Sequence, residues 1–523
     1  MWIVTGTEKD NVTLVSAKGT DRLLPIGTYL TAVGDDNVKH ILLVERSYQK
    51  SLFEPSPLVV DSDLPILKQD QECRNVLIAR EIKQLPLSQD GMFSFIKPNE
   101  KAKRSSQQEI NEIFTSKDGY PVFLATDFLG QNQVLKDDTY NMISVKVPYS
   151  SLYLQTMICG QTGSGKTVAM KYLIEQFLTH EKGAVLAINV KSIDLLTMDK
   201  PTTIESDQLR NQTELEWKTL KLEEKPIKSF RIYQPATSER CKEGVDRNKV
   251  SNITLRTRDL EPQAMLAVLR NMTDRAAEVL PDIFRYWKTV VPLADQTFGN
   301  FINWFKNQAT KENDYTFNII NSAEEPSTQK LHPGTADAIA RSLQSASAFF
   351  DRQENCVAIS ENTVLVKERL SVIDLSSKET TLFGAILLRH LLAKIYEAKA
   401  IRGEKKDVPI LIIIDEVHRF IGSNASAEAL EELSAIARMG RSEKIGVIFA
   451  SQNPQDLPKG LTTIVNTRIF FRSLEAVGKK YDSRISGIDL ASLADGYASM
   501  STSSVPQIKF VKFPMSRMGV KSD

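Results

Sequence analysis

The 523-residue sequence lacks several features that would indicate a secreted or membrane-spanning protein. Its four cysteines stand far apart and form no C-x-x-C pair, so neither a disulfide framework nor a zinc site is indicated. The first residues contain no basic and apolar leader, and no apolar run approaches the roughly 18 residues of a membrane span. We therefore expect a cytoplasmic protein with no membrane partner.

An excess of charge of one sign is also missing. Lys and Arg together number 66 and Asp and Glu number 65, so the total charge provides no general attraction to nucleic acid. From Arg438 onward, basic residues outnumber acidic ones, which fits either a surface facing a polyanion or an ordinary solvated basic face. The hydrophobic fraction of 41% is that of a soluble globular protein, and the length suggests roughly three domains.

The sequence pattern changes several times along the chain. Short β-rich runs with turn signals come first. They are typical of a small barrel or sandwich, and of the two we predict a barrel. Apolar strands alternating with amphipathic helices come later and predict an α/β class with a parallel, buried sheet. In chain order we expect an N-terminal β-barrel (1–85), a connector (86–140), the first part of the α/β core (141–204), a helical insertion (205–362), the second part of the core (363–500) and a C-terminal tail (501–523).

The stretch "GQTGSGKT" matches the phosphate-binding pattern G-x-x-x-x-G-K-[ST] between an apolar strand and a helix. Its glycines allow successive backbone N–H groups to converge on phosphate oxygens at a helix N-terminus. Lys166 is expected to neutralise the β and γ phosphates and Thr167 to bind Mg²⁺, which makes ATP with Mg²⁺ the expected cofactor. The candidate nucleotide-binding residues are Gly160, Gln161, Thr162, Gly163, Ser164, Gly165, Lys166, Thr167 and Val168.

A second motif, "ILIIIDE", is the most continuous apolar run in the chain and ends in Asp415 and Glu416. At the carboxyl edge of a central strand, Asp415 could hold Mg²⁺ and Glu416 could act as a general base on a water molecule. An ordinary solvated strand end is the alternative. A carboxylate placed to activate water favours ATP hydrolysis over phosphoryl transfer to a small substrate.

Four motifs in this order, "GQTGSGKTV", "ILIIIDEVHRF", "IARMGRSEKIGVIFASQNPQDLP" and "VNTRIFFRS", resemble the HerA branch of the HerA/FtsK superfamily of hexameric DNA-translocating ATPases. The resemblance implies a RecA-like P-loop core of the ASCE type, with an N-terminal β-barrel and a helical-bundle insertion. The sequence departs from the family at "INVKSIDLL", where many relatives have an acidic residue followed by Gly. There Lys191 is either a residue facing phosphate or DNA, or an ordinary exposed lysine.

The resemblance also assigns roles to residues outside the two phosphate-site motifs. Gln452, at the end of the apolar run "IGVIFAS", is expected to be a buried amide that senses the γ-phosphate, since an amide can both donate and accept hydrogen bonds. Arg438 and Arg441 are candidates for an arginine finger that reaches a neighbouring subunit, with Arg441 the better one. The alternative for both is a basic helix end that complements the helix dipole.

The function implied by the resemblance is an ATP-driven, ring-forming translocase or helicase of double-stranded DNA. We expect a homohexamer that contacts DNA without sequence preference, together with a separate nuclease or NADase-type effector on the barrel. The pathway is either antiphage defence, slightly favoured, or DNA-end processing. One alternative is an ATP-dependent assembly platform that activates an effector with little translocation. A second is a conjugative secretion ATPase.

The finger assignment predicts that hydrolysis depends on subunit association. We expect the ATPase rate per subunit to rise with protein concentration, and the double substitution Arg438→Ala plus Arg441→Ala to remove that rise, because the guanidinium would come from a neighbour. The rate should be measured against protein concentration with and without linear duplex DNA. A rate per subunit that is independent of protein concentration and unchanged by the double substitution would contradict the finger hypothesis.

Overall fold

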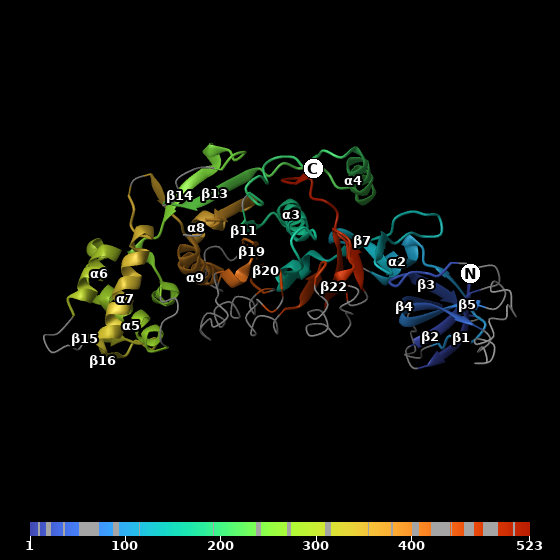
Figure 1. Ribbon diagram of the computed structural model, residues 1–523, viewed down its shortest axis with the longest axis horizontal. Helices are drawn as coiled ribbons and strands as arrows, with labels where there is room; N and C mark the ends of the chain where they lie inside the picture. The colour runs from blue at the N-terminus through green and yellow to red at the C-terminus, as the bar shows by residue number, and fades with distance from the viewer. Residues whose placement is uncertain are drawn as a thin grey trace, which may run out of the picture.

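The structure is a computed structural model, and it places a barrel, a large sheet and a helical insertion one after another along an elongated molecule (Figure 1). It describes residues 1–8, 11–16, 22–34, 37–51, 73–86, 94–114, 116–191, 193–236, 242–268, 274–308, 315–353, 355–377, 380–399, 407–419, 440, 442–453, 455, 465–473, 490–505 and 508–522. Within these ranges, no helix is both long enough and apolar enough to cross a membrane.

The N-terminal strands close into a barrel, which confirms the predicted barrel domain. Their order is β1 (Trp2–Glu8), β2 (Asn11–Ser16), β5 (Cys73–Leu85), β4 (Lys39–Ser51), β3 (Tyr29–Val33) and β6 (Lys101–Arg104). In β6, Ala102 pairs with Trp2 of β1 and with Ala32 of β3, so β6 completes the ring. This closing strand falls in the predicted connector, because its sequence KAKR has one apolar residue and shows no strand pattern.

The main sheet has a parallel part and an antiparallel part. The parallel part confirms the predicted α/β core and runs in the order β17 (Cys356–Ala358), β14 (Val250–Thr254), β13 (Ser229–Pro235), β18 (Arg369–Asp374), β11 (Ala184–Asn189), β19 (Ile410–Ile414), β20 (Ile445–Ser451), β10 (Thr156–Cys159) and β21 (Thr467–Phe470). The antiparallel part continues with β22 (Tyr497–Thr502), β23 (Phe510–Lys512), β7 (Tyr120–Phe128) and β8 (Gln131–Val134), and β9 (Ser144–Val147) also pairs with β7. Strands β7, β8 and β23 therefore extend the sheet into the segments predicted as connector and tail.

Helices cover both faces of the parallel strands. Alternate strand residues point to opposite faces, so Val185 and Ala187 of β11 pack with α3 (Lys166–Gln176), whereas Leu186 and Ile188 pack with α9 (Thr380–Lys399). The same alternation holds in β19 and β20, whose residues are almost all fully buried. The central strands are therefore dry on both faces, and polar side chains can reach solvent only at the strand ends.

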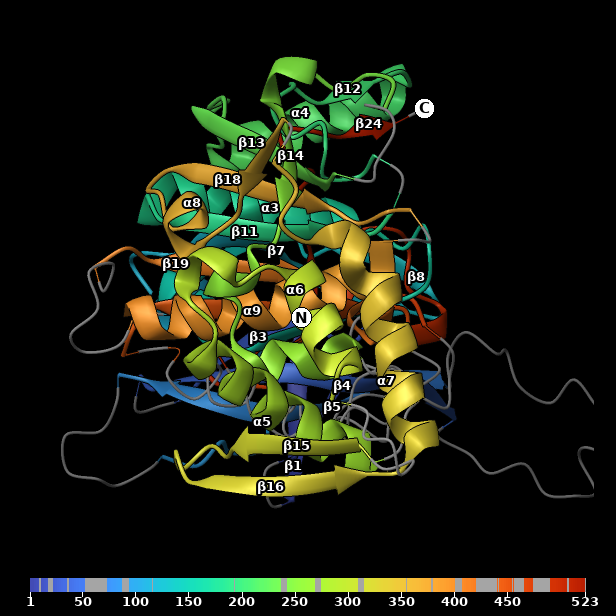
Figure 2. The ribbon, with the colours of Figure 1, turned by 90° about the vertical axis from the view of Figure 1, so that its left-hand side faces the viewer.

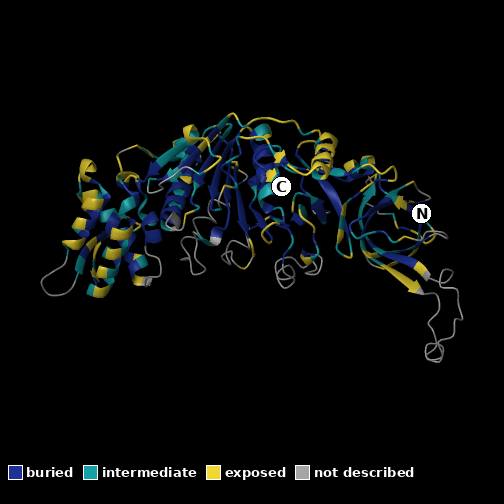
Figure 3. Cartoon of the chain, turned by 45° about the horizontal axis from the view of Figure 1, so that its top comes forward, coloured by how far each residue is buried: buried dark blue, intermediate teal, exposed yellow. Residues whose placement is uncertain are grey.

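The helical insertion leaves the sheet after β14 and returns at β17. It contains α5 (Asp274–Val290), α6 (Phe298–Lys306), α7 (Pro333–Ala346) and the hairpin of β15 (Tyr315–Ile320) and β16 (Pro326–Leu331), and it faces the viewer in Figure 2. Its aromatic core includes Phe284, Trp287, Phe301 and Phe305, while the outer helix faces are exposed (Figure 3). The predicted range of 205–362 is too wide, since β13, β14 and β17 belong to the sheet, where β13 pairs with β18 and β14 pairs with β17, strands far apart along the chain.

The C-terminal segment packs against the α/β core rather than forming a separate tail. After β23 it crosses α3, where Glu175 accepts hydrogen bonds from the Ser516 hydroxyl at 2.8 Å and the Arg517 backbone N–H at 2.9 Å. The buried Lys171 ammonium, one helical turn earlier, donates to the Gly519 carbonyl. Two buried charged groups of the P-loop helix are thus satisfied by the end of the chain.

The Glu175 carboxyl predicts a pH-dependent stability. Burial raises the pKa of Glu175 to about 7, and the hydrogen bonds from Ser516 and Arg517 oppose the shift without cancelling it. Because the folded pKa lies above the unfolded value, this group contributes stability at low pH that is lost as pH rises from about 4.5 to 7. We expect the melting temperature of the unsubstituted chain to fall relative to Glu175→Gln between pH 5 and 8. Glu214→Gln, at an exposed glutamate of α4 (Asp207–Leu220), is the control, and parallel pH curves for the chain and Glu175→Gln would contradict the assignment.

Candidate nucleotide-binding site

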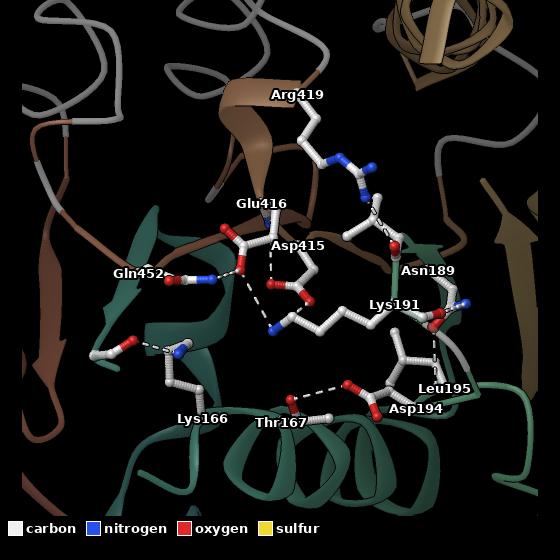
Figure 4. A network of polar contacts seen from close by, with 12 residues as sticks. Lys166, Thr167, Asn189, Lys191, Asp194, Leu195, Asp415, Glu416, Arg419 and Gln452 are labelled. Atoms are coloured by element: carbon white, nitrogen blue, oxygen red, sulfur yellow. Dashed lines mark hydrogen bonds and ion pairs between the residues drawn. The ribbon is translucent and has the colours of Figure 1, made fainter. Parts of the chain in front are cut away.

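The two phosphate-site motifs meet at the carboxyl edge of the parallel strands. Strand β20 lies between β10, which leads into the P-loop, and β19, which leads into the acidic pair Asp415 and Glu416. In the register, Cys159 at the end of β10 is opposite Ser451 at the end of β20. The P-loop, the acidic pair and Gln452 therefore emerge side by side (Figure 4), where ligands of open α/β sheets bind.

The P-loop is fixed by its backbone and by its glycines. The Gln161 N–H donates to the Arg472 carbonyl at 2.8 Å, and the Ser164 carbonyl accepts from the Gly496 N–H at 3.0 Å. Gly165 has a left-handed φ of +104°, and a Cβ there would lie 2.8 Å from the Gly496 nitrogen, so only glycine fits. Helix α3 begins at the next residue, and the exposed Gln161, Thr162 and Gly163 leave the loop open to a ligand.

Lys166 lies inside this loop as the sequence predicts. Its ammonium donates to the Gly160 and Gln161 carbonyls, the second at 2.9 Å. Burial lowers the pKa of Lys166 and the nearby Lys191 lowers it further, while the acidic pair opposes both effects. Negative charge from a bound phosphate would favour the charged ammonium, so the lysine is suited to an anionic ligand.

The acidic pair is buried, which contradicts the alternative of a solvated strand end. The side chains of Asp415 and Glu416 are 5% and 6% exposed. Glu416 adopts a left-handed φ of +47°, unusual for a residue with a side chain, and its N–H donates to the Asp415 carboxylate at 3.0 Å. Burial raises the pKa of Asp415, against the opposing effect of Lys191. Such a pair needs a compensating cation.

Lys191 is that cation in this structure. Its ammonium nitrogen lies 3.4 Å from an Asp415 oxygen and 3.4 Å from a Glu416 oxygen (Figure 4). Burial lowers the pKa of Lys191, but the acidic pair and Asp194 raise it more, and the net shift is upward. The sequence left Lys191 as either a phosphate- or DNA-facing residue or an exposed lysine; the structure places its partly exposed side chain against the acidic pair, a contact that the sequence did not indicate. Its position just after an apolar strand was the sequence signal that could have placed Lys191 near the site. Its partners could not be predicted in this way, because they depend on the order of the strands in the sheet.

The loop after β11 carries further polar groups toward α3. Asn189 donates to Asp374 at 2.9 Å and to the Lys191 carbonyl at 2.7 Å, and it accepts from the Leu195 N–H at 3.3 Å. The Thr167 hydroxyl donates to Asp194 at 3.5 Å. Asn189 thus anchors the loop that presents Lys191 and Asp194 to the P-loop helix. Asp194 has no role that its sequence pattern predicts.

The residues present fit a magnesium–nucleotide complex. Thr167 and Asp415 supply the hydroxyl and carboxylate oxygens that Mg²⁺ prefers. The Lys191 ammonium beside Asp415 shows that positive charge is favoured at this position. Val168 lies in the first turn of α3 and completes the predicted nucleotide-binding set.

Gln452 lies beside the acidic pair as its strand position predicts. Its amide nitrogen donates to a Glu416 oxygen at 3.3 Å. The residue is exposed, so the predicted buried amide is wrong: β20 ends at Ser451, and Gln452 is already outside the dry sheet. Arg438 and Arg441 lie outside the described residues. Arg419, not singled out from the sequence, donates to the Val190 carbonyl at 2.8 Å and links the segment after β19 to that after β11.

The chain is similar in sequence to archaeal proteins described as DNA double-strand break repair helicase HerA. The relative from Sulfolobus acidocaldarius is 28% identical over 167 residues, which cover 31% of this chain and 34% of the relative. The relative from Saccharolobus solfataricus is 25% identical over 217 residues, covering 39% and 43%. The matches thus span less than half the length of these relatives.

A solved structure, VirB4 of Thermoanaerobacter pseudethanolicus, superposes with a TM-score of 0.46 at 13% identity, covering 76% of this chain and 97% of that chain. The family described as "Helicase HerA-like C-terminal" matches residues 133–480, a range that includes the P-loop, the acidic pair and Gln452. Because this match spans more than half of the sequence, the chain belongs to the HerA-like helicase family.

Proposed function

We propose that this chain is an ATP hydrolase whose hydrolysis moves double-stranded DNA. The observation that carries the proposal is the buried acidic pair, held within 3.4 Å of a cation at the same sheet edge as the P-loop. A phosphate-binding loop next to a positioned carboxylate is the arrangement that ATP hydrolysis requires. Family membership supports the same conclusion.

Each residue of the site has a role that follows from its position. The P-loop backbone would hold the phosphates, and Lys166 would exchange its carbonyl partners for phosphate oxygens. Thr167 and Asp415 would hold Mg²⁺, which when bound neutralises phosphate charge. Glu416 would accept a proton from the attacking water, and the amide of Gln452, at 3.3 Å, would orient that carboxylate.

The DNA-translocating part of the proposal draws on the relatives, which are named as DNA repair helicases. We propose a homohexameric ring with DNA contacts that are mainly electrostatic and without sequence preference, so that binding weakens as salt rises. Arg438 and Arg441 are proposed as candidates for a finger that acts in a neighbouring subunit's site. A ring would make each site depend on two subunits.

The pathway part of the proposal concerns the N-terminal barrel. The barrel stands at the opposite end of the molecule from the helical insertion (Figure 1), which would leave it accessible to a separate nuclease or NADase-type effector. We propose that such a complex acts in the cytoplasm in antiphage defence or DNA-end processing. An assembly platform that activates the effector without translocation is the alternative that the next experiment tests.

The test is Glu416→Gln, which keeps the shape of the side chain but removes the proton acceptor. We expect ATP binding to be retained and hydrolysis to fall by about 10²–10⁴-fold, the usual contribution of a general base. Binding of a fluorescent ATP analogue and phosphate release should be measured together. Glu443→Gln, at a buried carboxylate just before β20 and therefore at the other end of that strand, is the matched control.

Two outcomes of this experiment would contradict parts of the proposed function. Hydrolysis by Glu416→Gln at the rate of the control would remove the general-base role. Full activation of a partner enzyme by the hydrolysis-deficient variant would favour the assembly platform over the motor.

A further inference from the structure

At the proposed magnesium–ATP site, both proposed magnesium ligands, the Asp415 carboxylate and the Thr167 hydroxyl, already make polar contacts with other side chains. The Lys191 ammonium lies against Asp415 and Glu416, and the Thr167 hydroxyl donates to Asp194 (Figure 4). Mg²⁺ binds oxygens at about 2.0–2.1 Å and tolerates little distortion of its coordination. An ammonium 3.4 Å from the Asp415 oxygen and a bound magnesium ion would therefore compete for the same carboxylate.

The geometry of the Lys191 contacts suits exchange. Both nitrogen–oxygen distances are 3.4 Å, longer than the roughly 2.7–2.9 Å of a tight charged hydrogen bond, and the lysine side chain is 27% exposed. The Asn189 side chain holds the Lys191 carbonyl at 2.7 Å, so the backbone is anchored. The ammonium can thus leave the acidic pair by side-chain rotation alone.

Asp194 is the alternative partner for that ammonium. It follows Lys191 by three residues in the loop after β11 and faces the P-loop helix through Thr167, and its negative charge raises the pKa of Lys191. Among the described residues, the side chain that donates to Asp194 is Thr167, at 3.5 Å, which is at the limit of hydrogen-bond length. If Thr167 turned its hydroxyl toward a metal ion, its hydrogen bond to Asp194 would break. The same metal ion would displace the Lys191 ammonium from Asp415 and Glu416, so Asp194 and Lys191 would both be left without these partners.

We infer that Lys191 is an exchangeable counter-ion: it holds Asp415 and Glu416 in the magnesium-free site and moves to Asp194 when Mg²⁺ and nucleotide bind. This inference rests on the proposed ATP site and adds a residue to it. It makes magnesium binding a competition between two cations for one carboxylate. The consequence is that the chain itself sets how much magnesium is needed to load nucleotide.

The experiment is a magnesium titration at a fixed concentration of a fluorescent, non-hydrolysable ATP analogue. Lys191→Met removes the competing charge while keeping most of the side-chain length. We expect the magnesium concentration at half-maximal binding to fall at least fivefold, the lower end of ordinary coupling between two sites. Lys191→Arg keeps the charge and should leave this midpoint within twofold of that of the unsubstituted chain.

A matched control is Lys249→Met. Lys249 also lies between two carboxylates, Asp199 at 2.6 Å and Asp246 at 3.9 Å, and its side chain is 32% exposed, but these partners are not part of the nucleotide site. It should leave the magnesium midpoint unchanged. A residue with only a structural role would lower the melting temperature without moving the midpoint downward.

A second variant keeps the inference testable if Lys191→Met does not fold. Asp194→Asn leaves the pairing of Lys191 with Asp415 and Glu416 intact but removes the destination of the ammonium, so the midpoint should rise. An unchanged or raised midpoint in folded Lys191→Met, or an unchanged midpoint in Asp194→Asn, would overturn the inference. Lys166→Ala tests the proposed ATP site separately from the role of Lys191. If this variant binds the analogue with the same affinity as the unsubstituted chain, the ATP site itself is misassigned.

Discussion

The burial of two neighbouring carboxylates is the constraint on which the rest of the site depends. Asp415 and Glu416 follow the most continuous apolar strand, and their side chains are almost inaccessible to solvent. Uncompensated buried charge is strongly unfavourable, so the fold has to deliver a cation to the same position. In this structure Lys191 provides it, and we propose that magnesium with ATP provides it during turnover.

The sheet makes this possible by keeping polar groups at one edge. The strands from β11 to β10 are apolar on both faces, because α3 and α9 cover them. Placing β20 between β19 and β10 brings Gln452 next to Glu416 and leaves the P-loop one strand away. The C-terminal segment then holds α3 from outside through Glu175 and Lys171. The site is therefore supported by segments from both ends of the core sequence.

Local motifs carried most of what the sequence could predict. The P-loop and the acidic pair each consist of a few consecutive residues that follow an apolar strand, so their positions at the strand ends followed from pattern alone. The partners of Lys191 did not, because they depend on β11 lying beside β19, a pairing between segments more than two hundred residues apart. The same reason explains β6, whose short sequence becomes a strand by pairing with the distant β1 and β3. It also explains the places of β14 and β23 in the sheet, where each has one distant partner, β17 and β7 respectively. Gln452 was placed correctly along the chain, but its exposure depends on where β20 ends.

The ATPase activity of the purified chain with Mg²⁺ and linear duplex DNA, compared between the unsubstituted protein and Lys166→Ala, tests both the assigned site and the proposed motor. We expect duplex DNA to stimulate hydrolysis in the unsubstituted protein. In the variant we expect loss of both basal and stimulated hydrolysis, because its P-loop has no ammonium for the phosphates. Equal hydrolysis by the two proteins would contradict the assigned site. Hydrolysis that depends on Lys166 but is not stimulated by duplex DNA would contradict the proposed motor.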